Sequence, residues 1–209
     1  MKLVVSVLDL DALFRAVAAG ADAIEVRLDL LPEPDHKGVR ETLATIATPR
    51  IITLRSAAEG GAFLGTAEEW RERLEPWLAI ADYVDIERPF AACADGIRGS
   101  GATIIASNHR NDMPGPAALR DLERELRGFG DLPKIIVAPA SIEDAILLLT
   151  FTATAKRPVA TGVMGEKFRY LRAILPLFGS ELAFCHAGSP TSPGQYHIDE
   201  MRQLLEMLQ

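Results

Sequence analysis

The feature that most constrains the fold is a repeated alternation of short apolar runs with longer amphipathic segments. Eight runs rich in β-branched residues have the pattern of strands. They cover residues 3–7, 23–29, 50–55, 82–87, 102–109, 134–139, 158–164 and 182–187. Eight segments with helical spacing follow them and cover residues 9–19, 37–47, 66–79, 90–99, 116–128, 141–154, 166–177 and 197–208. Such alternation predicts a parallel sheet covered by helices.

Local signals support the helices. Thr66 and Glu69 form a capping-box pattern, and Ser141 is an expected N-cap, whereas Pro76 interrupts the third helix. Only two connections are long, at residues 55–65 and 187–196, and no linker divides the chain. We therefore expect a single α/β domain over residues 1–209, a (β/α)8 TIM barrel. The alternative is an open doubly wound sheet, in which the first and last strands would not pair.

Composition excludes several classes of partner. The 209 residues carry a formal net charge of -7, so nothing attracts nucleic acid or an anionic membrane, and an anionic ligand would need locally placed arginines. Cys93 and Cys185 are far apart and lack metal-site spacing, which favours a reducing compartment. No apolar run is long enough to span a bilayer. We expect a cytoplasmic protein that acts on small molecules, without a metal.

Polar residues gather at the carboxyl ends of the predicted strands, where the active site of a (β/α)8 barrel is built. They are Glu25, Arg27, Asp29, Arg55, Asp85, Glu87, Asn108 and His109, with Glu59 in the following loop. A single charge at a strand end is usually only solvated. Several at one end of the barrel favour a site.

Lys134 opens an apolar run, and strand alternation places it on the same face as Ile136 and Ala138. One interpretation is a lysine at the strand start that extends to the bottom surface of the barrel. The other is a desolvated amine that forms a Schiff base with a carbonyl substrate. On the preceding strand, His109 is placed to move protons, and Glu59 to orient its imidazole.

The last third of the chain holds candidates for anion binding. Arg172 lies on the flank of an apolar helix stripe, where it either covers apolar surface or binds a carboxylate. Glycines before that helix offer only a weak phosphate-binding pattern. The loop at residues 187–196 is a candidate lid, and its Gln195 is suited to a hydroxylated ligand.

Several separated motifs, in order along the chain, resemble the type I 3-dehydroquinate dehydratase family. "IEVRLD" resembles its Glu-x-Arg-x-Asp strand, and "LRSAAEGG" its Arg-Ser-x-x-Glu-Gly-Gly loop. "SNH" and "PKIIVAP" resemble the segments that carry the catalytic histidine and the Schiff-base lysine. "FGS" and "SPGQ" resemble the closing motifs. The chain departs from the family at Phe168, where glycine is usual, at Leu171, where serine is usual, and at Thr191 and Ser192, where Ser-Ala is usual.

The resemblance implies a carbon–oxygen lyase of the shikimate pathway that converts 3-dehydroquinate to 3-dehydroshikimate as a homodimer without cofactor. It implies that Lys134 forms the imine, that His109 is the general acid and base, and that Glu59 positions His109. It further implies a set of substrate-binding residues: Ser6, Glu25, Arg27, Arg55, Arg172, Thr191 and Gln195. Two alternatives remain open at this point, a class I aldolase acting on a phosphorylated substrate and a non-catalytic barrel that only binds its ligand.

Overall fold

Eight parallel strands form one sheet in the computed structural model, which describes residues 1–208. The strands are β1 (Lys2–Val7), β2 (Ala23–Arg27), β3 (Arg50–Thr53), β4 (Tyr83–Glu87), β5 (Thr103–His109), β6 (Leu132–Val137), β7 (Ala160–Val163) and β8 (Leu182–Cys185). Each strand pairs with its neighbour in sequence from β1 to β7, and β1 also pairs with β8.

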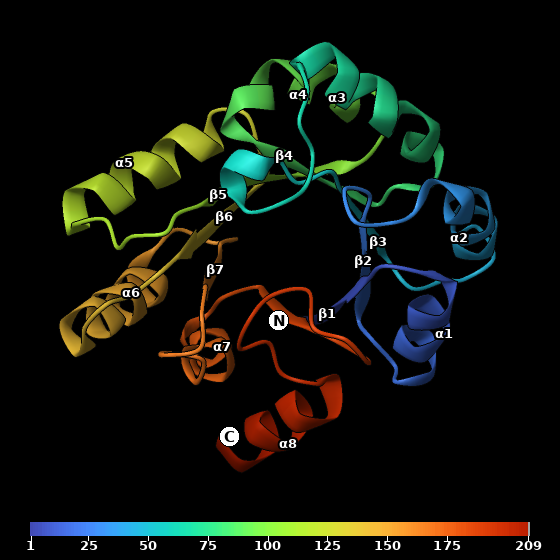
Figure 1. The fold of residues 1–209 in the computed structure, drawn as a ribbon. Coiled ribbons are helices and arrows are strands. Elements are labelled where there is room, and N and C mark those ends of the chain that lie inside the picture. The colour runs from blue at the N-terminus through green and yellow to red at the C-terminus, as the bar shows by residue number, and fades with distance from the viewer. Residues whose placement is uncertain (209) are drawn as a thin grey trace.

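The helices lie in a ring around the strands (Figure 1). They are α1 (Leu10–Ala18), α2 (His36–Leu43), α3 (Ala67–Leu74), α4 (Ala94–Arg98), α5 (Pro116–Arg127), α6 (Ile142–Thr154), α7 (Leu171–Ile174) and α8 (Ile198–Leu208). Short 3-10 turns extend or precede several of them, at Glu33–Asp35, Ala57–Glu59, Glu75–Ile80, Arg88–Cys93 and Leu175–Phe178. No helix within residues 1–208 has the length and apolar character needed to cross a membrane.

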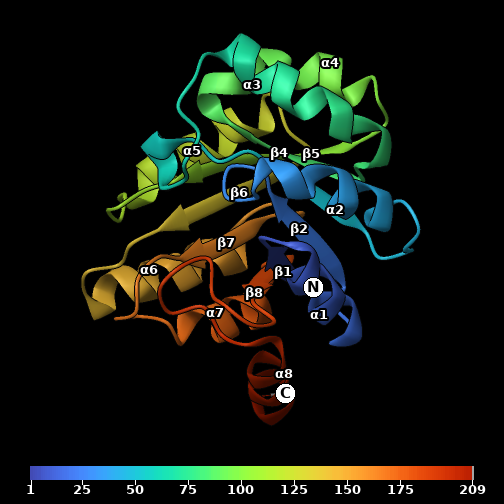
Figure 2. The same ribbon diagram turned by 45° about the vertical axis from the view of Figure 1, so that its right-hand side comes forward.

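The sheet curls into a nearly closed (β/α)8 barrel, in which the first and last strands lie side by side (Figure 2). Lys2 of β1 stands opposite Leu182 of β8, which rules out the open-sheet alternative. Strand pairing joins β7 to β6 and β8 to β1, and the hydroxyl of Ser180, just before β8, hydrogen-bonds to Thr161 of β7. It accepts from the Thr161 amide at 2.9 Å and lies 3.0 Å from the Thr161 carbonyl oxygen.

The barrel interior is apolar below and polar above. One cluster of buried side chains fills the lower part: Val4, Ala23, Ile51, Ile105, Leu132, Ala160 and Leu182. Alternation along the strands places the next inward residues two positions further toward the carboxyl ends. These are mainly polar and include Ser6, Glu25, Thr53, Asp85, Ser107 and Lys134, all buried. The core therefore supports a polar layer at the barrel mouth.

Local chemistry explains where the elements begin and end. Thr66 and Ser141 cap α3 and α6, each with a complete capping box, as the sequence predicts for Thr66. At Pro76 the helical course of α3 gives way to a 3-10 turn, because proline has no amide hydrogen to donate. The prediction of a helix from residue 166 was wrong, since residues 166–170 form only bends and turns before the short α7.

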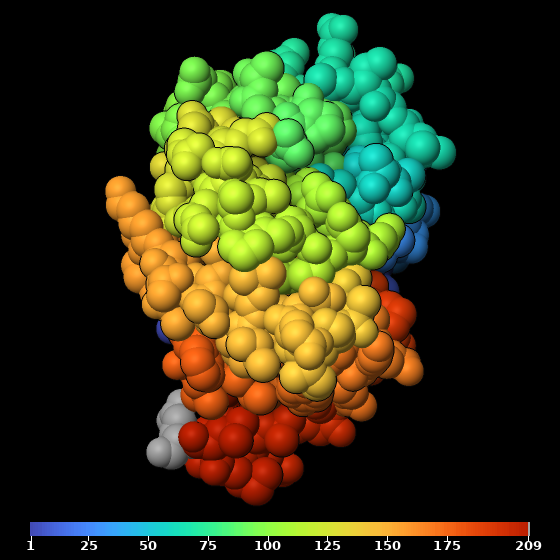
Figure 3. Space-filling model, turned by 90° about the vertical axis from the view of Figure 1, so that its left-hand side faces the viewer, coloured from blue at the N-terminus to red at the C-terminus, as the bar shows by residue number. Residues whose placement is uncertain are grey.

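The side of the molecule formed by α5 and α6 is shown in space-filling form in Figure 3. On this side α6 carries apolar residues outward, and Ile142 and Ile146 are 57% and 58% exposed. A helix that is apolar on both its inner and outer faces is usually covered on both.

Candidate active site

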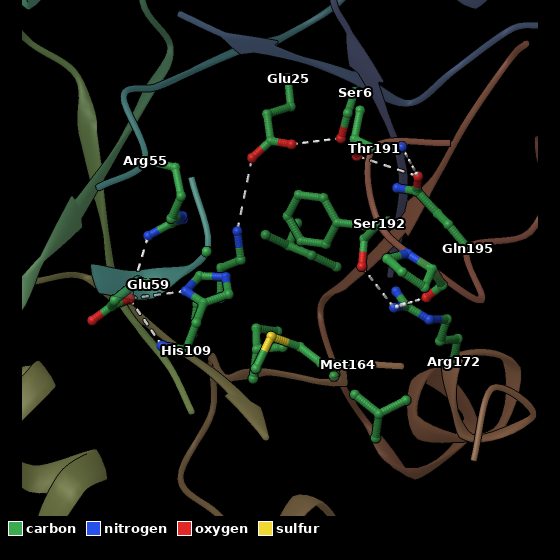
Figure 4. Close-up of a pocket in the computed structure, with 18 of the residues that line it drawn as sticks. Ser6, Glu25, Arg55, Glu59, His109, Met164, Arg172, Thr191, Ser192 and Gln195 are labelled. Atoms are coloured by element: carbon green, nitrogen blue, oxygen red, sulfur yellow. Dashed lines mark hydrogen bonds and ion pairs between the residues drawn. The ribbon is translucent and has the colours of Figure 1, made fainter. Parts of the chain in front are cut away.

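A cavity of about 360 Å³ opens at the carboxyl ends of the strands. Every one of the ten residues that the sequence suggests as site residues lines it: Ser6, Glu25, Arg27, Arg55, Glu59, His109, Lys134, Arg172, Thr191 and Gln195. The residues that line the cavity come from seven of the eight strands or from the segments that follow them, and Met164 directly follows β7. The two long connections supply Glu59, Thr191 and Gln195. Figure 4 shows most of these side chains converging on the same space.

Lys134 lies inside the barrel. It is the third residue of β6, not the first, because the strand begins at Leu132. The side chain is only 4% exposed, and its Nζ lies 2.9 Å from Asp85 Oδ2 and 3.8 Å from Glu25 Oε1. The same nitrogen stands 4.0 Å from the centre of the Phe184 ring. The interpretation of a lysine reaching the bottom surface is therefore wrong, and its nearest charged partners are carboxylates.

Asp85 is the carboxylate that holds this amine. Its Oδ1 accepts from Ser107 Oγ at 2.5 Å and pairs with Arg55 at 2.9 Å, and its side chain is fully buried. Burial alone would raise the pKa of Asp85, but Arg55 and Lys134 outweigh it and lower the pKa to about 2. Asp85 is therefore a permanent anion at neutral pH.

Arg55 lies among three carboxylates. Besides Asp85 it pairs with Glu87 at 2.7 Å and with Glu59 at 3.5 Å. Burial works against its charge, yet Asp85 and Glu87 raise the pKa of Arg55. Glu87 also accepts from the amide and hydroxyl of Ser56. These bonds fix the loop after β3, and with it Glu59, against the barrel.

His109 and Glu59 form a largely buried pair (Figure 4). Glu59 Oε2 lies 3.0 Å from His109 Nδ1 and accepts from the His109 amide at 2.9 Å, while Oε1 accepts from Asn108 at 2.9 Å. Burial raises the pKa of Glu59 to about 7. Burial, then Arg55 and Lys134, lower the pKa of His109 well below its usual range. The imidazole is therefore neutral, and with Glu59 ionised its Nδ1 donates and its Nε2 keeps a free lone pair.

Glu25 accepts from Ser6 Oγ at 2.5 Å and from Thr53 Oγ1 at 2.9 Å. Arg27 forms a two-pronged pair with Asp29, at 2.9 Å and 2.7 Å. Both side chains line the cavity in a fixed geometry, which suits them to hydrogen-bond a polyhydroxylated ligand.

Arg172 differs from the other cations of the cavity because it pairs with no carboxylate among residues 1–208. Its terminal nitrogen lies 3.4 Å from Ser192 Oγ and donates to the Pro193 carbonyl at 3.2 Å, and its buried Nε has no partner there. Burial lowers the pKa of this guanidinium. Beside it, Gln195 Oε1 accepts from the Thr191 amide at 2.9 Å, a bond within the loop at residues 187–196. An unpaired guanidinium at a cavity wall is a ready carboxylate site.

Sequence reasoning assigned no role to three further residues of this region. Asp85 was visible as a charge at a strand end, and Ser107 lies two positions before His109 on the same face. Phe184 gave no signal, because an aromatic residue in a strand is ordinary. Among residues 1–208, no group of three or more histidine, cysteine or acidic side chains is arranged to hold a metal ion.

Comparison with known proteins identifies the family of this chain. Residues 4–209 match the family described as type I 3-dehydroquinase. A 3-dehydroquinate dehydratase of Methanoregula boonei is 48% identical over 208 residues, covering 100% of both chains, and one of Methanospirillum hungatei is 38% identical, covering 100% of this chain and 81% of the relative.

Solved structures agree. The 3-dehydroquinate dehydratase of Geobacillus kaustophilus superposes with a TM-score of 0.89 at 25% identity, covering 99% of this chain and 90% of its own. The type I enzyme of Clostridium difficile, solved with covalently modified comenic acid, gives 0.88 at 25% identity, covering 99% and 91%. The chain therefore belongs to the type I 3-dehydroquinase family, a family of carbon–oxygen lyases.

Proposed function

We propose that this protein dehydrates 3-dehydroquinate to 3-dehydroshikimate, a step of the shikimate pathway, through an imine on Lys134 with His109 as general base and acid. Family membership supports the reaction. The observation that carries the mechanism is the joint presence, in one cavity, of a buried amine at Lys134, a neutral imidazole at His109 and an arginine without an anion at Arg172.

The first step is imine formation. The neutral Lys134 amine attacks the substrate ketone, and the resulting carbinolamine loses water to give a protonated imine. A proton must first leave the ammonium form of Lys134, and Asp85 is too weak a base to take it because its pKa is about 2. The proton passes to solvent through the cavity, and solvent returns a proton when the carbinolamine hydroxyl leaves as water.

The second step is proton removal. His109 Nε2 takes a proton from the carbon next to the imine, and the electron pair moves into the protonated imine to form an enamine. Glu59 keeps the ring oriented through Nδ1, at 3.0 Å, and balances the imidazolium that forms. The enamine then expels the hydroxyl, which leaves as water with the proton from His109. Hydrolysis of the imine releases the product and restores Lys134.

The remaining residues bind the substrate. Arg172 binds the carboxylate, because it lines the cavity and its guanidinium has no anionic partner within residues 1–208. Glu25, Arg27 and Arg55, with Gln195, Ser6 and Thr191, bind hydroxyl and carboxylate oxygens. Arg55 already pairs with three carboxylates, so its main contribution is a fixed positive charge and hydrogen-bond donors that orient the substrate.

The test combines an absorbance assay with chemical trapping. Incubation with 3-dehydroquinate should generate the ultraviolet absorbance of a conjugated enone. Borohydride added with substrate should leave one adduct on the peptide that contains Lys134, whereas borohydride alone should leave activity intact. An adduct on Lys156 or Lys167 would overturn the mechanism. A class I aldolase would instead cleave a phosphorylated substrate, and a binding module would give no absorbance change.

The same proposal includes a homodimer located in the cytoplasm. The apolar outer face of α6, with Ile142 and Ile146 more than half exposed, supports an association between copies. Cys93 and Cys185 are free thiols, as expected in a reducing compartment. Light scattering after size-exclusion chromatography tests the dimer: a monomeric mass at micromolar concentration would contradict it.

A further inference from the structure

The contact between Asp85 and Lys134 has no role in the steps described above. Asp85 Oδ2 lies 2.9 Å from Nζ inside the barrel, and both side chains are almost completely buried. The carboxylate is held from two further sides, by Ser107 Oγ at 2.5 Å and by Arg55 at 2.9 Å. A buried carboxylate fixed by three partners does not swing away when its lysine reacts.

We propose that Asp85 is a catalytic residue, the counter-ion that keeps the imine nitrogen on Lys134 protonated during turnover. This inference rests on the proposed imine mechanism. Imine formation replaces the three N–H bonds of the ammonium group with one, so only one hydrogen bond to nitrogen survives. Asp85 already accepts a hydrogen bond from Nζ at 2.9 Å, so it is the partner that accepts the one remaining N–H of the imine.

Protonation of the imine matters because only the cationic form accepts the electron pair released at the neighbouring carbon. The nitrogen lies directly above the apolar core of the barrel, with Ile105, Leu132 and Leu182 in the layer below. Such surroundings favour the neutral imine. A fixed anion in direct contact offsets this effect and also stabilises the cation that is regenerated when the hydroxyl leaves.

The other groups around the nitrogen do not replace Asp85. Glu25 on β2 is farther away, at 3.8 Å, and already accepts from Ser6 and Thr53. Arg55, which follows β3, is positively charged, and His109 on β5 is neutral. The Phe184 ring on β8, 4.0 Å away, favours a cation but holds no net charge. On β1, β6 and β7 the facing residues are Ser6, Ile136 and Gly162, none of which titrates in this range.

Two reducing agents separate the protonated from the neutral imine. Cyanoborohydride reduces the protonated form, whereas borohydride reduces both. The experiment mixes each reagent with the enzyme and 3-dehydroquinate across a pH series and measures the adduct by mass spectrometry of the intact protein. For the wild type we expect the ratio of the cyanoborohydride adduct to the borohydride adduct to stay constant from about pH 6 to about pH 8.5.

In Asp85→Asn we expect that ratio to fall as the pH rises, by about tenfold at pH 8, because a contacting opposite charge shifts such equilibria by about one unit or more. Turnover should fall over the same pH range, while KM changes little. Glu87→Gln is the matched control, since Glu87 lies on the same strand and pairs with Arg55 at 2.7 Å but does not contact Nζ. Its ratio should follow the wild type.

The outcomes are distinct. If borohydride leaves no adduct on the wild type, the imine mechanism itself fails. If borohydride traps the imine but Asp85→Asn keeps the wild-type ratio, or Glu87→Gln lowers it equally, the counter-ion role is wrong. Should Asp85→Asn fail to fold, Ser107→Ala removes one bond that holds Asp85, and a smaller decrease of the ratio in the same direction is then required.

Discussion

Replacing Arg172 with alanine removes the one cation of the cavity that pairs with no carboxylate among residues 1–208. Among residues 1–208, the hydrogen-bond partners of its guanidinium are Ser192 Oγ and the Pro193 carbonyl. A bound carboxylate would gain two hydrogen bonds from the terminal nitrogens of the guanidinium. The variant should fold normally, because deletion of this side chain leaves no buried anion without its partner.

The expected loss follows from the bonds that the ligand would make. Each hydrogen bond to a charged group contributes about 1.5 to 3 kcal/mol, and the lower value applies here because the lid leaves the guanidinium partly accessible to water. Two such bonds give about 3 kcal/mol, or roughly a 150-fold weaker affinity for the substrate. Arg172→Lys keeps the charge but loses the fork, so we expect about a tenfold loss.

Calorimetric titration with a carboxylate-bearing substrate analogue and with its neutral amide measures this contribution. The carboxylate should lose affinity in Arg172→Ala, whereas the amide should bind the variant and the wild type alike. Arg169→Ala is the matched control, because Arg169 is near in sequence but stacks on Tyr196 at 4.1 Å and does not line the cavity. An equal loss for the acid and the amide would show that Arg172 does not bind the carboxylate.

Three further expectations concern the buried groups. His109→Ala should keep the fold and the borohydride-trapped imine but lose nearly all turnover, and near-normal turnover would remove His109 from the mechanism. Lys134→Met should trap nothing and be inactive. It should also unfold about 6 to 12 °C lower, because removing one partner of a buried ion pair costs about 3 kcal/mol, and calorimetry that showed no decrease would contradict the pairing. Because the pKa of Glu59 is raised from its ordinary 4.5 to about 7, the native state binds the extra proton in that window and loses stability as the pH rises through it. Glu59→Gln should therefore gain up to about 3 kcal/mol relative to the wild type between pH 5 and pH 8, and a pH-independent difference in thermal unfolding would refute the shift.

The sequence by itself determined the architecture and the place of the site. Strand alternation and helical spacing are local properties, so the sequence alone identifies the strands and helices. Eight strand and helix pairs with short connections then favour a barrel over other arrangements. The same alternation brings residues such as Glu25, Lys134 and His109 to the inner face at the carboxyl ends of their strands. The motifs that resemble the family added the substrate, which residue spacing does not encode.

Only the tertiary structure decided the charges of the site. Asp85 and Lys134 lie on two different strands and Arg55 follows a third. The pKa values of Asp85 and Arg55 depend on distances that no local pattern contains. The sequence suggested a desolvated lysine amine, whereas closure of the barrel places this amine against a carboxylate. Likewise, burial lowers the pKa of His109, and Arg172 has no carboxylate partner among residues 1–208. Electrostatic energies in a buried site vary with distance and solvent exposure, and both are fixed only when the eight strands come together.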